Sequence, residues 1–537
     1  RGYHLYLKDN RLEVNMAHTA PSNAITRISG VAVPKDQWIQ LTLTYDGSSK
    51  AAGLQLYLDG QPMAMETTMD QLTKDILFVN SLQPGQQPGL QIGGWWRGLG
   101  FKGGKADDVL VYNRVLRPYE IKVIAGKAKW SAITDNTPDH LPDAGLQALK
   151  DYYTAVVDPG MLKARAELQQ LRTALADSTE NVPELMVMQE MPRPKKTHIL
   201  LRGNYDALGE EVFPNTPSAI LPFPKELPKN RYGLALWLTN KDNPLTARVM
   251  VNRMWQNFFG TGLVKTAGDF GNQGEMPSHP ELLDWLAIHF RETGWDIKQL
   301  NKMIVMSATY RQNSRASAAA REKDPENRLL SHGPAYRMTA EMIRDNALMA
   351  SGLMQLQIGG KSVKPYQPEG LWGINNTSYT QDTGTAVYRR SLYVVIKRSV
   401  PNPTLATFDA SSRSYCVVRR QLTNTPLQAL VTLNDPTFIE ASMVLGEQMT
   451  KAGSGPQGII DAYRKLTGRT PNPQETALLM KLRNTEQQRF SAHPQKAKGW
   501  LYTGQYAADK KLDAALLAAN AVVANTILNS DAALTKR

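Results

Sequence analysis

Hydrophobic and polar residues alternate in two neighbouring stretches near the start of the chain, at 41–45 and 54–58. Each stretch leads directly into an Asp-Gly pair, at 46–47 and at 59–60. Alternation with a period of two is typical of β-strands, and Asp-Gly tolerates the positive φ angles that tight turns require. The pattern therefore predicts antiparallel strands joined by short turns. Residues 90–94 and 106–116 continue the same style, and we expect strands there as well.

A different period governs the later part of the chain. Val251, Trp255 and Phe258 recur at helical spacing, which predicts a helix with one buried face. Proline directly after a capping side chain marks several helix starts, because proline at the first helical position loses no hydrogen bond. We expect such starts at 243–244, 278–281, 425–426 and 434–436, the second being a capping box.

These patterns divide the chain into three parts. Residues 1–126 are predicted to be all-β, and residues 231–537 are predicted to be mainly α-helical. Residues 127–230 form a connector, with a helical pattern over 143–177 that is interrupted near 159–160, a short strand at 197–203, and a proline-rich end. A chain of 537 residues is too long for one core, so several domains are expected.

The first part resembles a laminin-G-like, concanavalin-A-type jelly roll over roughly residues 1–126. Members of that family combine a Trp, a Tyr-Asp-Gly turn, an Asp-Gly turn and an Asp-Asp strand start at comparable spacing. The resemblance implies a β-sandwich that binds a ligand rather than one that catalyses a reaction. The residues that carry it are Trp38, Tyr45, Asp46, Gly47, Tyr57, Asp59, Gly60, Asp107, Asp108, Tyr112, Arg114 and Leu116.

The helical part resembles the DUF1553 family, the planctomycete PSD1-type proteins, over about residues 230–500. The resemblance rests on 243–255, 279–287, 389–391, 408–420 and 433–436, among other segments. Relatives usually have Glu where this chain has Ser414. Family members are exported bacterial proteins that often carry a cytochrome-c-like segment and a DUF1549 domain upstream, which implies a periplasmic or extracellular location. The chain opens on Arg1 in a strand pattern, so we expect a fragment whose upstream part would hold any haem.

The net charge and the cysteine content limit the classes of function that the sequence allows. The net charge is +13, and residues 1–127 contribute 14 Lys and Arg against 11 Asp and Glu, so most of the excess lies in the later part. A basic protein of this kind suits an anionic partner. Without a nucleic-acid-binding motif, nucleic acid is the least favoured partner. No apolar run is long enough for a membrane span. The single cysteine allows no disulfide within the chain, and no metal motif is present, so no cofactor is expected in this chain.

Segment 388–420 is the main candidate for ligand binding. Arginine chelates sulfate, carboxylate or phosphate through paired hydrogen bonds, and aromatic rings stack on sugar faces. Tyrosines and a phenylalanine are interleaved with the basic residues, which suits an anionic glycan. Alternatively, the arginines bridge helix ends and pair with acids elsewhere in the fold. The candidate residues are Arg389, Arg390, Lys397, Arg398, Asp409, Arg413, Cys416, Arg419 and Arg420.

Cys416 has two interpretations. Three nearby arginines would lower the pKa of its thiol and make it reactive. A lone cysteine in a helical fold is more often a buried small apolar residue, which is the expectation favoured here. Similarly, Glu341, Arg344 and Asp345 lie within about one helical turn, and we expect local ion pairs among them.

Four other groups have a structural explanation beside a functional one. Asp269, His279 and Asp284 suit acid–base or metal chemistry, although capping and solvation explain them better. Residues 248–253 carry arginines and an asparagine beside an apolar stripe, which indicates bracing of the helices. Two adjacent residues in a glycine-rich loop, Trp95 and Trp96, suit either sugar stacking or a domain contact. Asp107 and Asp108 are weak candidates for a calcium site, and a turn cap is the alternative.

The sequence thus leaves three functions open. The leading one is an extracytoplasmic binding or scaffold protein that engages a polysaccharide, with further protein partners. The second is an enzyme that acts on anionic polysaccharide through the helical domain, although no catalytic pair can be chosen from the sequence. The third is a docking or electron-transfer partner of an upstream haem domain.

Overall fold

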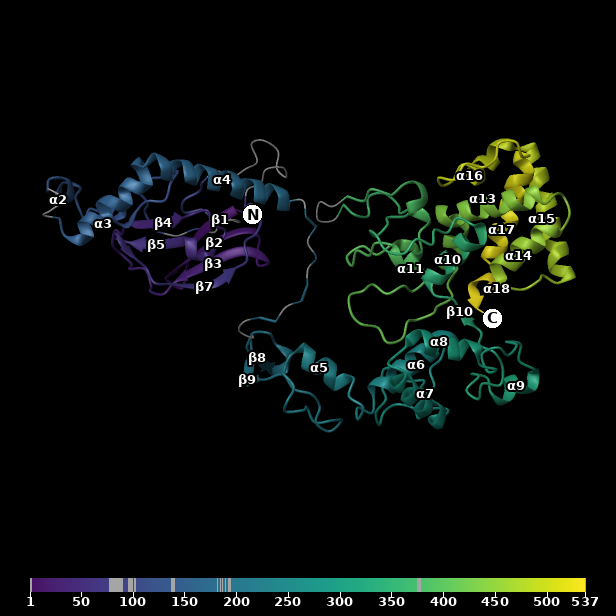
Figure 1. The fold of residues 1–537 in the computed structure, drawn as a ribbon. Helices are drawn as coiled ribbons and strands as arrows, with labels where there is room; N and C mark the ends of the chain where they lie inside the picture. Colours follow the sequence, from purple (N-terminus) through teal and green to yellow (C-terminus); the bar gives the residue numbers. More distant parts are fainter. Residues whose placement is uncertain are drawn as a thin grey trace. The chain divides into compact units, whose positions relative to one another are not determined.

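The computed structural model describes residues 2–76, 90–94, 100, 103–136, 141–180, 182–183, 185, 187–188, 190–191, 195–373 and 378–536. The chain divides into two compact units, residues 1–189 and residues 190–537. The expected order is confirmed: strands dominate the start of the first unit, and helices dominate the second (Figure 1).

Two antiparallel sheets form the core of the first unit. One sheet has the order β1-β2-β3-β7 and the other the order β4-β5-β6. Apolar residues from both sheets share one buried cluster, which includes Val14, Ile25, Leu54 and Leu56, so the sheets pack face to face as a sandwich. The strands are β1 (Gly2–Lys8), β2 (Arg11–Thr19), β3 (Asn23–Ser29), β4 (Leu41–Tyr45), β5 (Leu54–Leu58), β6 (Gln61–Pro62) and β7 (Met65–Asp70).

The turns behave as their sequence predicts. Asp59 and Gly60 have φ angles of 47° and 78°, and they connect β5 to β6. Gly47 follows β4 with a φ of 72°. Only residues that tolerate the left-handed region permit strands to reverse this tightly.

The expected strands at 90–94 and 106–116 are wrong for the described structure, and residues 90–94 are irregular. Residues 104–112 are irregular, and Val109, Leu110 and Val111 are exposed. Asp108 has a φ of 51°, which is incompatible with an extended strand, and the Asp107 side chain accepts a hydrogen bond from its backbone N–H. Local hydrogen bonding at this Asp-Asp pair therefore competes with strand formation.

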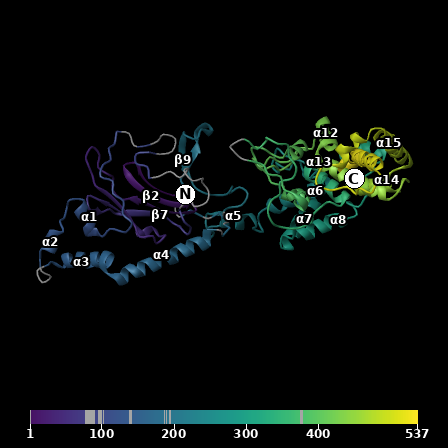
Figure 2. The same ribbon diagram turned by 90° about the horizontal axis from the view of Figure 1, so that it is seen from above.

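Helices complete the first unit. They are α1 (Pro118–Ile124), α2 (Ser131–Thr134), α3 (Asp143–Tyr152) and α4 (Pro159–Glu180), with a π-helical turn at Tyr153–Val157 and a break at Asp158, next to the interruption expected near 159–160. α4 runs along one side of the strands (Figure 2). Arg172 in the middle of α4 donates a hydrogen bond to the Asp46 carbonyl, and Lys74 donates hydrogen bonds to the Glu180 and Val182 carbonyls, so the middle and the C-terminal end of the helix are hydrogen-bonded to the sandwich.

The second unit begins with a hairpin and a group of helices around Trp255 and Phe290. The hairpin pairs β8 (Thr197–Leu200) with β9 (Leu208–Val212), and the proline-rich stretch that follows is irregular as expected. The helices are α5 (Arg231–Leu238), α6 (Thr246–Phe259), α7 (Pro280–Glu292), α8 (Ile297–Met306) and α9 (Ala318–Lys323). The apolar faces of α6, α7 and α8 share one core, as the helical spacing predicts.

The larger core of the second unit lies around α13 and α17, which pack closely because Gly446 has no side chain. A Cβ at this position would lie 2.6 Å from the Ala521 backbone nitrogen. A two-stranded sheet of β10 (Tyr336–Arg337) and β11 (Thr535–Lys536) ties this part back to the chain end. The helices are α10 (Ala340–Ser351), α11 (Pro403–Thr407), α12 (Pro426–Asn434), α13 (Pro436–Lys451), α14 (Gln457–Thr467), α15 (Pro473–Ala492), α16 (Lys498–Leu501), α17 (Ala514–Leu528) and α18 (Asp531–Leu534).

The expected helix starts at 425–426 and 434–436 follow the sequence, whereas α6 begins at Thr246 with Leu245 rather than Asn243 as its N-cap. Asp435 caps α13 by accepting a hydrogen bond from the Thr437 N–H, and Pro436 is its first residue. The expected capping box at 278–281 is wrong, because His279 is the N-cap of α7 and makes no capping hydrogen bond. None of the helices in the described part of the chain has both the length and the apolar content that crossing a bilayer requires.

Candidate functional site

Segment 388–420 crosses the second unit mostly as irregular chain, and α10 holds its beginning in place. Arg344 is buried, and its guanidinium donates hydrogen bonds to the Arg389 carbonyl at 2.9 Å and the Val387 carbonyl at 2.7 Å. The neighbouring carboxylate of Asp345 accepts a 2.8 Å hydrogen bond from the Ser391 N–H. Burial lowers the pKa of Arg344, while nearby carboxylates oppose the shift. α10 therefore serves as the platform for the segment.

The expectation of local ion pairs on α10 is confirmed for Arg344 and Asp345, whose charged groups lie 3.8 Å apart, but not for Glu341. Glu341 instead pairs at 2.6 Å with Arg420, which lies 79 positions away. Arg344 and Asp345 additionally satisfy backbone groups that the irregular segment would otherwise leave buried and unpaired.

Two of the candidate arginines are held by partners within the protein. Arg389 is buried, donates to the carbonyls of Lys361 and Gln357, and stacks on Tyr393 with 3.8 Å between guanidinium carbon and ring centre. Arg420 is held by Glu341. These two side chains fasten the segment, as the structural alternative predicts, and their charge is not presented to a ligand.

Asp409 likewise stabilises the segment from within. Its carboxylate accepts hydrogen bonds from both the backbone N–H and the hydroxyl of Thr423, each at 2.7 Å. Its backbone has a φ of 61°, which allows the chain to reverse after α11. The only acidic residue of the segment is thus directed at its own loop.

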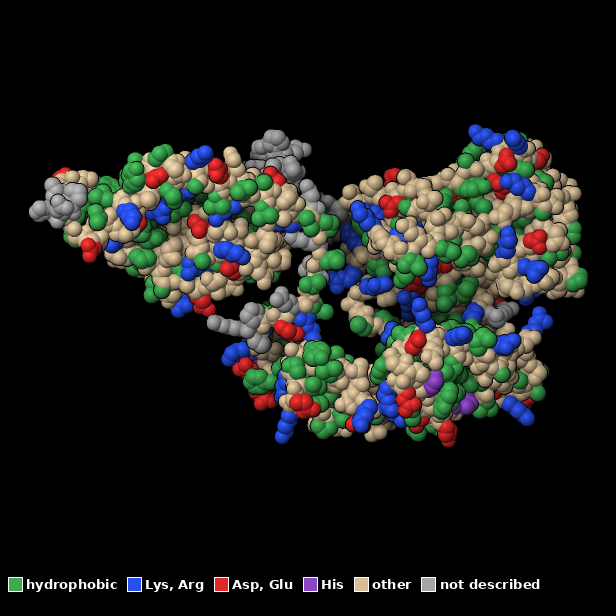
Figure 3. Space-filling view, viewed as in Figure 1, with side chains coloured by type: hydrophobic (Ala, Val, Ile, Leu, Met, Phe, Trp, Pro, Cys, Tyr) green, Lys and Arg blue, Asp and Glu red, His purple; other side chains and the backbone are tan. Residues whose placement is uncertain are grey.

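The remaining arginines are on the surface. Arg390, Arg398, Arg413 and Arg419 are exposed, and within the described ranges no ion pair or side-chain hydrogen bond is assigned to any of them. Lys397 lies 4.5 Å from the ring centre of Trp372. Basic side chains gather on the part of the second unit that is drawn in green in Figure 1, with few acidic ones among them (Figure 3). The four exposed arginines and Tyr415 are called the arginine surface below.

Tyr415 supplies an aromatic group to this surface. Its side chain is 75% exposed, and it lies in the chain between Arg413 and Arg419. An exposed ring close in sequence to unpaired guanidinium groups has the composition that binds a charged sugar, because the ring packs on C–H groups while arginines chelate the acid.

The favoured sequence interpretation of Cys416 as a buried small residue is wrong. It is exposed, not buried. The loop that carries it, residues 411–420, has only partly buried or exposed residues, so the thiol has no core to enter.

The other sequence candidates are mainly structural. Arg248 pairs with Asp284 at 2.6 Å, and Asn252 is buried and exchanges two hydrogen bonds with the backbone of Val264, so the expected bracing is confirmed. Asp269 caps its own turn through the Gly271 N–H. Asp107 and Asp108 are exposed, and calcium binding there stays a prediction. Among the described residues, no group of three or more His, Cys, Asp or Glu could hold a metal ion. Trp95 and Trp96 lie outside the described residues.

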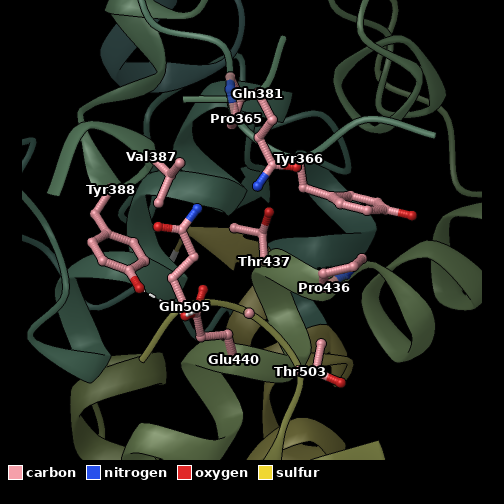
Figure 4. Close-up of a pocket in the computed structure, with 11 residues that line it drawn as sticks. Pro365, Tyr366, Gln381, Val387, Tyr388, Pro436, Thr437, Glu440, Thr503 and Gln505 are labelled. Atoms are coloured by element: carbon pink, nitrogen blue, oxygen red, sulfur yellow. Dashed lines mark hydrogen bonds between the residues drawn. The ribbon is translucent and has the colours of Figure 1, made fainter. Parts of the chain in front are cut away.

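A pocket that the sequence did not reveal lies beside α13. It has a volume of about 210 Å³, and its carboxylate is Glu440, which is buried. One oxygen, Oε1, accepts three hydrogen bonds: from the Tyr388 hydroxyl at 2.7 Å (Figure 4), and from the N–H groups of Gln505 and Tyr506 at 2.6 and 2.7 Å. Burial raises the pKa of Tyr388, so the phenol stays protonated and donates to the carboxylate.

Three separate parts of the chain build this pocket: 365–388, 436–440 and 503–505. A usable sequence signal does exist. α13 is almost entirely buried, and Glu440 is an acid within that apolar run. An acidic residue in a fully buried helix requires dedicated partners, and this requirement could have identified it.

Comparison with protein families places both parts of the chain. Residues 230–483 match the family described as protein of unknown function (DUF1553), and residues 1–122 match the concanavalin A-like lectin/glucanases superfamily. The chain therefore joins a part similar to lectin-like proteins to a part similar to DUF1553 proteins. Both resemblances noted from the sequence are confirmed. Searches of curated proteins and of solved structures find no match. Together the two domains indicate a binding or scaffold role.

Proposed function

We propose that this protein binds an anionic polysaccharide outside the bacterial cytoplasm and that the arginine surface of its DUF1553 domain contacts the acidic groups. One observation carries the proposal. Four arginines are exposed without an assigned partner in the described residues, although Arg389 and Arg420 of the same segment are held by the fold. The lectin-like domain supports a polysaccharide as the ligand class, and the net charge of +13 supports an acidic one.

The physical basis is paired hydrogen bonding between guanidinium and acid, with Tyr415 packing on the sugar. Such contacts are solvent-exposed charges, so salt weakens them. An exposed arginine also keeps its charge at every physiological pH, which makes binding insensitive to pH over the range where the acid is ionised.

The test compares dextran sulfate with dextran, which share a backbone and differ in charge. Binding to immobilised dextran sulfate is expected to weaken by about tenfold or more between about 0.05 M and about 0.5 M salt, because screening shortens the reach of each charge. The double variant Arg413→Ala/Arg419→Ala is expected to weaken it by about tenfold, or about 1.4 kcal/mol.

A matched control removes the same charge elsewhere. Arg253 and Lys298 are exposed on α6 and α8, so Arg253→Ala/Lys298→Ala lowers the net charge equally without touching the arginine surface. This control is expected to bind nearly as the unchanged protein does. Equal losses in both double variants would attribute binding to net charge alone and would overturn the proposed site.

A further inference from the structure

We infer that the Glu440 pocket binds a single sugar ring without negative charge, at a site separate from the arginine surface. None of the residues that line the pocket belongs to the arginine surface. The inference goes beyond the proposed function, since it concerns a second site and a different kind of sugar.

The carboxylate defines the charge that the pocket accepts. Glu440 is 5% exposed, and no ion pair is assigned to it in the described part of the chain. Oε1 is already surrounded by three donors, and Oε2 remains as the second acceptor on the same group. A buried carboxylate repels an acidic ligand strongly and accepts hydrogen bonds from hydroxyl groups readily.

The walls supply apolar surface. Pro365, Val387 and Pro436 line the pocket together with the rings of Tyr366 and Tyr388. Figure 4 shows the two tyrosines on opposite sides of the labelled group. A sugar ring combines C–H faces with a rim of hydroxyl groups, so it can use aromatic and prolyl walls together with polar groups.

Polar side chains remain available around these walls. The hydroxyl groups of Tyr366 and Thr437 and the amide of Gln381 have no hydrogen bond assigned within the described residues. Figure 4 shows the Gln381 amide directed toward the pocket interior. In contrast, the Gln505 amide is occupied, because it accepts from the Gly384 N–H and donates to the Asp382 carbonyl.

These available groups select the ligand class. An amide and two hydroxyl groups both donate and accept, which matches sugar hydroxyls that also do both. The volume of about 210 Å³ is below the roughly 300–1,000 Å³ of pockets for drug-sized ligands, so one ring rather than an extended chain enters. The site therefore suits an end or a side branch of a glycan.

The experiment is ligand-observed saturation-transfer NMR on the full chain with glucose, galactose, mannose, xylose, N-acetylglucosamine and glucuronic acid as probes. At least one of the uncharged sugars is expected to bind, and glucuronic acid is expected to bind at least about tenfold more weakly than glucose. Gln381→Ala and Tyr366→Ala are each expected to reduce binding by about tenfold. Binding is expected to be the same at low and high salt, unlike that of dextran sulfate.

Tyr415→Ala is the matched control, because Tyr415 is also an exposed tyrosine but belongs to the arginine surface. It is expected to leave binding of the uncharged sugar unchanged and to weaken binding of dextran sulfate. Tyr366→Ala is expected to weaken binding of the uncharged sugar and to leave binding of dextran sulfate unchanged. The inference is overturned if none of the uncharged sugars binds, if glucuronic acid binds as well as glucose, or if Gln381→Ala binds normally with an unchanged melting temperature.

Discussion

The side chain of Arg344 donates a 2.9 Å hydrogen bond to the backbone carbonyl of Arg389, so one buried arginine positions the chain on which another lies. Arg389 in turn donates to the carbonyls of Lys361 and Gln357. Arginine is suited to this role because its planar group carries five donors in a fixed geometry. Two arginines thus organise the loop from inside, and the loop presents others to solvent.

Arg344→Met is expected to destabilise the protein by about 3 kcal/mol, because it leaves buried carbonyl groups without donors. Urea unfolding followed by far-ultraviolet circular dichroism measures the change. Arg413→Met removes an exposed arginine and is expected to change stability by no more than about 0.5 kcal/mol. Similar effects of the two substitutions would show that Arg344 does not anchor the segment.

Gly504→Ala is expected to destabilise the protein and to distort the Glu440 pocket. A Cβ at Gly504 would lie 2.2 Å from the Glu440 carboxyl carbon, and the backbone there has a φ of 90°. Gly453 has a similar φ of 93° but open space around it, so Gly453→Ala measures the conformational cost alone, about 1 kcal/mol. Melting temperatures of both variants test this expectation, which fails if Gly504→Ala is no worse than Gly453→Ala.

Glu475→Gln is expected to lower the melting temperature at neutral pH and to matter less in acid. Hydrogen bonds from Arg469 at 2.6 and 2.8 Å, assisted by the Asn472 N–H, lower the pKa of Glu475 to about 2. A depressed pKa contributes stability above the unfolded value of about 4.3 and loses it as pH falls toward the folded value.

Melting temperatures of the Glu475→Gln variant and the unchanged protein should therefore converge between about pH 5 and pH 2. Glu322→Gln is the control, because Glu322 is exposed on α9 and has no assigned ion pair in the described ranges. Its melting temperature should follow that of the unchanged protein throughout. A Glu475→Gln difference that does not vary with pH would contradict the ion pair.

Cys416 is expected to react with a maleimide in the folded protein, since its side chain is exposed. Intact-mass measurement should show one added group per chain, because the sequence contains one cysteine. Cys416→Ser should remain unlabelled. Dextran sulfate is expected to slow the labelling, since Cys416 adjoins Tyr415 on the arginine surface. Labelling that requires urea would restore the buried interpretation.

Local features of this protein were predictable from the sequence because they depend on neighbouring residues. Alternation with Asp-Gly turns predicted β4 and β5, and Asp435-Pro436 predicted the start of α13. The strand prediction for residues 106–116 is wrong because the same alternation also suits an irregular stretch. The positive φ at Asp108 prevents a strand there. Strand formation further requires a partner strand, which a local pattern does not specify.

The sequence by itself determined the two domain types, the basic character of the second unit and the segment that carries the arginines. Only the tertiary structure decided which of these arginines are held by partners within the fold, because each choice depends on distant carbonyls and acids such as those at 357–361 and 341. The Glu440 pocket depends entirely on the tertiary structure. Its residues come from 365–388, 436–440 and 503–505, and such groups meet only when the free energy of the whole core brings them together.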